Sequence, residues 1–225
     1  MSSRQEEKER RRQEREAREA AAAAKARRGR LLQLIGGVIV ACAIVAGVAY
    51  AVSSGGGDGG GGDDVDDAML TSAATAAGCT YRAFPEESRD HVTKKLTAAN
   101  FKTNPPTSGA HNPNPAQDGI YATGNEPEIE NWVHTLEHGR VLLQYRPGTS
   151  AAVVRQLEDL FKEDVKGSGD GYHSVLMQNN SEMPFQVAAV SWRHYMGCRA
   201  FTPASIEALR TFREEVIDKA PEKIP

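Results

Sequence analysis

The sequence predicts an α/β or α+β domain of about four or five strands with flanking helices, placed behind a single transmembrane helix. Two observations support this fold class. Residues 31–52 are apolar and carry no charge. Beyond residue 68, short apolar runs typical of strands alternate with segments in which apolar residues recur at helical spacing. These roughly 155 residues are enough for one hydrophobic core.

The apolar stretch 31–52 has the length of a membrane span, because its 22 residues at about 1.5 Å each cover the roughly 30 Å hydrocarbon core. Residues 1–30 hold eleven Lys or Arg and six Glu, whereas the rest of the chain is acidic. The positive-inside rule therefore predicts a cytoplasmic tail at 1–30, a single-pass anchor in the cell membrane, and an extracytoplasmic C-terminal domain.

A cleaved signal peptide is the alternative to this anchor. Ala49-Tyr50-Ala51 has the small-x-small form of a cleavage site, and cleavage there would release a soluble domain. Against it, the apolar run exceeds the roughly 7–15 residues of a signal-peptide core, and the charged leader is long. In both cases the residues after Val52 lie outside the cytoplasmic membrane.

The segment between the apolar stretch and the domain is rich in Gly and Asp. Such a composition cannot bury a core, so residues 53–67 are predicted to be a flexible linker and residues 68–225 the globular domain. The six Glu of the tail interrupt its basic charge, which argues against nucleic acid as a partner. The membrane and an envelope protein are the candidate partners.

Two cysteines lie in the predicted domain, Cys79 and Cys198, and a third, Cys42, lies in the apolar stretch. In an oxidising compartment a single pair is most simply a disulfide. A redox or metal-binding thiol is the alternative, but neither domain cysteine belongs to a CxxC motif.

Helix and strand boundaries follow from Pro, Gly and capping residues. Pro127 suits the first turn of a helix that ends at Gly139, and Pro203 opens the last helix after Thr202. Thr149 or Ser150 caps the helix between them. Strands are predicted at 119–123, 141–145, 174–178 and 185–192. The stretch 86–101 is ambiguous between a short strand at His91-Val92 and a helix capped by Ser88.

Three histidines cluster around the predicted helix 127–138. His134 and His138 are four residues apart, so both imidazoles project from one helix face, and His111 follows a rigid Pro-rich turn. Three imidazoles with one open position suit a transition-metal ion, zinc or copper, with His91 as a weaker fourth ligand. The alternative explanation is that these histidines make ordinary structural hydrogen bonds.

A sequence motif of an enzyme class overlaps this group of histidines. His134-Thr-Leu-Glu137-His138 has the H-x-x-E-H order of inverted zinc peptidases, in which two histidines bind zinc and the glutamate is the general base. That motif also needs a long helix and a distant acidic ligand, whereas Gly139 ends this helix at once. We therefore expect a binding or structural module with a histidine metal site, and a zinc-dependent hydrolase using Glu137 as the alternative.

Four sequence motifs resemble a known bacterial family. PPTSGAH, GIY, VHTLEHGRVLLQYRP and AAVSW are similar to segments of the membrane-anchored proteins catalogued as domain-of-unknown-function family 3105. The resemblance covers about residues 78 to 222. It implies an extracytoplasmic domain behind one membrane span, of unestablished activity, and a His-Val pair that His91-Val92 matches.

Overall fold

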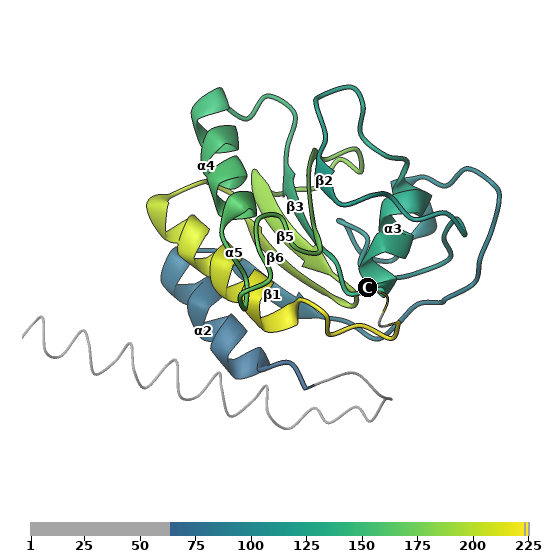
Figure 1. Ribbon diagram of the computed structural model, residues 1–225, viewed down its shortest axis with the longest axis horizontal. Helices are drawn as coiled ribbons and strands as arrows, with labels where there is room; N and C mark the ends of the chain where they lie inside the picture. Colours follow the sequence, from purple (N-terminus) through teal and green to yellow (C-terminus); the bar gives the residue numbers. More distant parts are fainter. Residues whose placement is uncertain (1–63, 223, 225) are drawn as a thin grey trace, which may run out of the picture. The chain divides into compact units, whose positions relative to one another are not determined.

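The computed structural model describes residues 64–222 and residue 224. These residues form an α+β domain in which one six-stranded mixed sheet packs against four α-helices (Figure 1). The predicted tail 1–30, the apolar stretch 31–52 and the linker up to residue 63 lie outside the described residues. Within the part of the chain that is described, no helix is both long and apolar enough to cross a membrane.

The elements of the described chain alternate between helix and strand for most of its length. In chain order they are α2 (Asp67–Ala77), β1 (Thr80–Ala83), the 3-10 helix η1 (Ala98–Asn100), β2 (Gly119–Ile120), α3 (Ile129–Glu137), β3 (Val141–Tyr145), α4 (Ala151–Lys162), β4 (Ser174–Gln178), β5 (Val187–Ser191), β6 (His194–Cys198) and α5 (Pro203–Val216). The predicted strands at 141–145 and 174–178 and the predicted helix start at Pro203 are confirmed.

The expectation of four or five strands is wrong for the described residues, because the sheet has six. The two strands that the sequence does not reveal are β1 and β6. β1 is a four-residue edge strand with one buried residue, and Gly197 interrupts the apolar pattern of β6. Neither strand has the alternation that identifies a half-buried strand, so both are formed by backbone pairing, β1 with β6 and β6 also with β5.

The sheet order is β1-β6-β5-β3-β4-β2. Strands β1, β6, β5 and β3 pair antiparallel, whereas β3, β4 and β2 pair parallel. All five residues of the inner strand β3 are buried. Both of its faces are covered by helices, so its sequence VLLQY is apolar at four of five positions and does not alternate, with Gln144 buried as well.

Two hydrophobic clusters lie on opposite faces of the sheet. Val141 and Leu143 of β3 contact the cluster that includes α2, α4 and α5, whereas Leu142 contacts the cluster that includes α3. Figure 1 shows α2, α4 and α5 together on one side of the sheet and α3 on the other. Helix α3 is therefore the single α-helix of the described residues on its face.

Helix α3 ends where the C-terminal segment crosses it. His138 is its C-cap, and Gly139 follows with φ of +81°. A Cβ atom on Gly139 would lie 2.9 Å from the Asp218 Cα, and the Asp218 N–H donates to the Gly139 carbonyl at 2.9 Å. Glycine is required here by both the positive φ and the close backbone approach.

Arg213 ties α5 to α4 from a position that is only 1% exposed. Its Nη1 donates to the Leu160 carbonyl at 2.7 Å and to the Glu163 carbonyl at 3.1 Å, and its Nε donates to Ser174 Oγ at 3.0 Å. The carbonyls at the end of a helix lack partners within that helix. The buried guanidinium therefore satisfies the end of α4 and fixes the packing of both helices on β4.

Cys79 and Cys198 form a disulfide, as the sequence predicts, with their Cα atoms 4.3 Å apart. Cys79 follows the left-handed cap Gly78 of α2, and Cys198 ends β6. The bond closes a loop with a sequence separation of 119 residues. It joins the start of the described domain to the strand that precedes α5.

Replacing both cysteines with Ser should lower the free energy of unfolding by roughly 2–5 kcal/mol, because the cross-link restricts the unfolded chain. Denaturant unfolding of the full-length chain can be followed by tryptophan fluorescence, since Trp132 and Trp192 are both buried. Reduced wild-type protein should match the double variant. Equal midpoints for oxidised wild type and the double variant would contradict a stabilising bond.

Candidate metal centre

Helix α3 places the ionisable side chains of His134 and Glu137 where water does not reach them. Eight of its nine residues are buried, so it is covered both by the sheet and by the chain on its other side. Trp132, Val133 and Leu136 belong to the hydrophobic cluster on the sheet. His134 and Glu137 lie three residues apart, which puts them on one helix face, and they are 4% and 1% exposed.

The connection between β1 and β2, residues 84–118, forms the second wall. Its only helix is η1, and a loop of this length inside a compact domain usually has a function. His91 and His111 pair in an isolated parallel bridge, in which the Val92 N–H donates to the His111 carbonyl at 2.7 Å. The Asn112 N–H donates to the Glu130 carbonyl at 3.0 Å, which ties the loop to α3.

Buried polar residues hold the Pro-rich turn before His111. Thr107 and Ser108 are 0% exposed. The Arg193 N–H donates to the Thr107 carbonyl at 2.8 Å, and Ser108 Oγ accepts from the Glu87 N–H at 3.0 Å. Ser108 thus has a structural role in the turn, and His111 is delivered to α3 by a loop that is fixed at several points.

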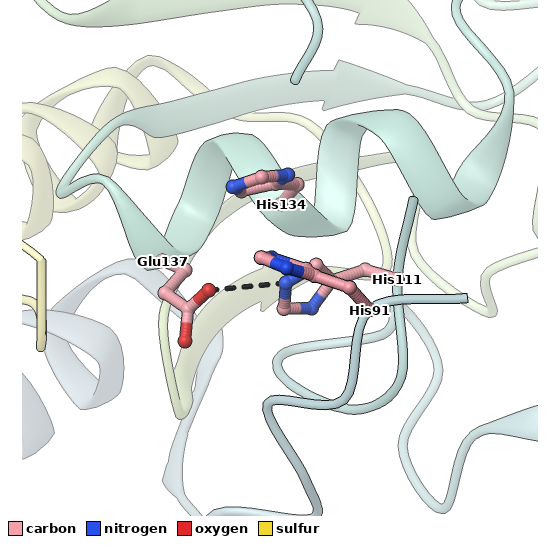
Figure 2. A group of neighbouring side chains, drawn as sticks. All are labelled: His91, His111, His134 and Glu137. Carbon is pink, nitrogen blue, oxygen red and sulfur yellow. Dashed lines mark ion pairs between the residues drawn. The ribbon is translucent and has the colours of Figure 1, made fainter. Parts of the chain in front are cut away.

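Four side chains converge between the loop and α3 (Figure 2). One ligand atom from each of them lies within 4.8 Å of the others: His91, His111, His134 and Glu137. The ring centroids of His111 and His134 are 4.7 Å apart, and the His91 ring is 4.9 Å from each of them. Two elements far apart in sequence therefore supply one compact group of nitrogen and oxygen donors.

Hydrogen bonds to carbonyls determine which imidazole nitrogens carry hydrogen. His111 Nδ1 lies 2.8 Å from the Gly109 carbonyl oxygen, and His134 Nδ1 lies 2.6 Å from the Asn112 carbonyl oxygen. A carbonyl only accepts, so both Nδ1 atoms donate. In the neutral rings each Nε2 then has a free lone pair, and this is the arrangement in which metal-binding histidines are commonly held.

Burial shifts the protonation equilibria of this group. It lowers the pKa of His111, His134 and His138, with the carbonyl hydrogen bonds of the first two acting in the opposite direction. Burial, reinforced by the negative charge of Glu222, raises the pKa of Glu137 to about 7. These three histidines are therefore neutral at neutral pH, and neighbouring groups do not fully compensate the negative charge of an ionised Glu137.

His111 and Glu137 are in contact but do not satisfy each other. His111 Nε2 lies 3.0 Å from Glu137 Oε2, and yet His111 Nε2 and Glu137 Oε1 have no hydrogen-bond partner. The nearest cation to Glu137 is Arg89, whose Nε lies 3.8 Å from Glu137 Oε1. Buried polar atoms without partners are costly, and a cation bound between these two lone-pair donors would satisfy both.

The comparisons with known proteins give a family but no activity. The family model described as protein of unknown function (DUF3105) matches residues 91–224. The chain belongs to this family. No curated protein and no solved structure matches the chain. The part that matches the DUF3105 model begins at His91 and contains every donor residue of the site.

The structure of this DUF3105 chain divides the predicted ligand set. His111 and His134 come together as predicted, and His91 joins them. His138 is not part of that group. It forms a second group with His134 and Glu222. His138 is the C-cap of the helix and stays beside His134, with their ring centroids 4.4 Å apart, and its Nε2 lies 3.2 Å from Glu222 Oε2.

Two carboxylates of the DUF3105 site are not predicted as ligands. The three-residue spacing of His134 and Glu137 is a signal that could have indicated a shared face, although the sequence suggests only a catalytic role for Glu137. Glu222 has no local signal, since it comes from the C-terminal segment. His194 lies elsewhere: its Nδ1 is 2.8 Å from the Trp192 carbonyl and its ring stacks on Tyr81.

Proposed function

We propose that this protein is a membrane-anchored, extracytoplasmic metal-binding protein that holds one divalent transition ion, zinc or copper(II). The ligands are His91, His111, His134 and Glu137. One observation carries the proposal: His111 Nε2 and Glu137 Oε2 lie 3.0 Å apart in a buried site, and His111 Nδ1 is already bonded to a carbonyl. A cation between them converts two opposed acceptors into two ligands.

The donor set fits a borderline or moderately hard divalent ion. Imidazole suits zinc, copper, iron and nickel, whereas thiolates and thioethers select copper(I). Both described cysteines are in the disulfide, and Met177, Met183 and Met196 lie in the hydrophobic clusters. Three nitrogens and one carboxylate oxygen form a four-coordinate set of the kind that zinc accepts.

A protonated Glu137 is the competing explanation. With a pKa of about 7, its carboxyl group is partly protonated near neutral pH and would donate to His111 Nε2. The observed contact lacks hydrogen-bond geometry, since His111 Nε2 has no hydrogen-bond partner. This explanation also leaves the convergence of His91 and His134 on the same point without a cause.

The full-length chain, purified in detergent without chelators, should contain one zinc or copper ion per chain by elemental analysis. His111→Gln and His134→Gln each remove a ligand nitrogen and should weaken binding at least about a hundredfold, because even residues that only support a ligand contribute about tenfold to a hundredfold.

His194→Gln is the matched control for these variants. Its Nδ1 also faces a backbone carbonyl, but it lies outside the donor group, so metal content should not change. A wild-type chain that binds no stoichiometric metal would refute the proposal. So would an equal loss of affinity in the His194 and His134 variants, since that would reflect general destabilisation.

The extracytoplasmic placement is supported by the charge asymmetry on the two sides of residues 31–52 and by a disulfide of the kind that persists in oxidising compartments. Protease added to intact cells should cut the linker 53–67 and leave the tail 1–30 protected, as read from tags at the two ends. Digestion of the N-terminal tag in intact cells would reverse the orientation. A free domain that begins near Val52 without protease would indicate cleavage after Ala51.

A zinc-dependent hydrolase is the second candidate, and two observations favour it. The pKa of Glu137, about 7, suits a general base at neutral pH, and Glu222 supplies the acidic third ligand that His134 and His138 need. In that case the zinc-loaded chain should hydrolyse peptides, and Glu137→Gln should retain zinc but lose turnover. If Glu137 is a ligand instead, the variant loses metal affinity and the wild type shows no turnover.

A further inference from the structure

The second donor group is built by the C-terminal segment. It comprises His134, His138 and Glu222, whose ligand atoms lie within 4.8 Å of one another. The Glu222 N–H donates to the Glu137 carbonyl at 3.1 Å, which places the backbone of Glu222 against the end of α3. Two residues further on, the Ile224 carbonyl accepts from Arg140 Nη1 at 2.6 Å. These contacts hold Glu222 beside His138.

The two donor groups share one atom. His134 Nδ1 is committed to the Asn112 carbonyl at 2.6 Å, so Nε2 is the only nitrogen that His134 offers to either group. One imidazole lone pair binds one ion. The two groups are therefore alternative positions for a single ion: an inner position at His91, His111, His134 and Glu137, and an outer position at His134, His138 and Glu222.

The two positions differ in how far their side chains are exposed to solvent. The inner residues His111 and Glu137 are 0% and 1% exposed, whereas the side chains of His138 and Glu222 are 10% and 43% exposed. His91 is also exposed, but among residues 64–222 and 224 no further donor group adjoins it. A metal ion that has lost some of its inner ligands therefore finds further ligands on the Glu222 side of the inner position and none on the His91 side.

We infer that the metal ion is loaded and released through the outer position, and that it passes to the inner position while staying bound to His134. The inference rests on the proposed metal-binding function. During the transfer the bonds to His138 and Glu222 break, and bonds to His91, His111 and Glu137 form. Each position contributes one carboxylate, so the charge that compensates the ion is the same before and after.

Stepwise ligand exchange explains why both positions are needed. An ion that leaves the inner position in one step would lose its buried ligands His111, His134 and Glu137 together before water replaces them, which is costly for a charge. Retention of the His134 bond together with capture by His138 and Glu222 lowers that barrier. The species delivered or removed would be a hydrated or chelated divalent transition ion, because the exposed outer position leaves coordination sites for water or a carrier's ligand.

The test measures zinc exchange by the full-length chain in detergent. A chromogenic chelator follows removal of zinc from the loaded protein, and mixing of free zinc with stripped protein follows uptake. His138→Asn and Glu222→Gln should slow uptake and removal by a similar factor of at least about ten, the effect of losing one supporting group at a metal site. The zinc content at saturation should stay at one ion per chain, and Kd should change much less than either rate.

Two control variants complete the design. His194→Gln and Asp170→Asn alter a histidine and an exposed carboxylate outside both positions, and they should exchange zinc at the wild-type rate. Unchanged rates in the His138 and Glu222 variants, with zinc still bound, would overturn the loading path and leave the metal site intact. Loss of zinc from His138→Asn would make His138 a principal ligand and would also overturn it. Absence of zinc from the wild type would instead refute the proposed function.

Discussion

The enclosure of α3 between the sheet and the loop 84–118 is the constraint on which the rest of the site depends. The apolar face of the helix packs on β3, β4 and β5, and this packing fixes its rotation. The opposite face then presents His134 and Glu137 to the loop, which is itself bonded to the helix through Asn112. The same packing removes water from both side chains, so their chemistry follows from the fold.

Such a site lowers the stability of the domain unless something is bound there. A buried carboxylate with a pKa raised to about 7, next to an imidazole nitrogen without a hydrogen-bond partner, conflicts with the ordinary requirement that buried polar groups be satisfied. Gln144 Nε2 and Ser191 Oγ are also buried without partners, but neither lies beside a second such atom, and at the end of α4 Arg213 satisfies the buried carbonyls. Local violations of this kind are characteristic of functional sites.

The C-terminal segment connects the stability of the fold to the site. Gly139 allows the backbone of Asp218 to approach α3 closely, and the segment then continues to Glu222, which faces His138. The end of α5 and the end of α3 are therefore held by the same backbone contacts. A change in this segment would alter both the packing beneath it and the pKa of Glu137, because the negative charge of Glu222 adds to burial in raising that pKa.

The sequence by itself determined what local patterns encode: the inner strand at 141–145, the helix opened by Pro203, the pairing of the two domain cysteines, and a histidine group around α3. These outcomes depend on residues close together in the chain, except the disulfide, for which each domain cysteine has only one possible partner in the domain. The tertiary structure alone decided that β1 and β6 are strands, that His138 groups with Glu222 and not with His111, and that Glu222 joins the site. Those outcomes rest on long-range strand pairing and on the path of the C-terminal segment, which neighbouring residues do not specify.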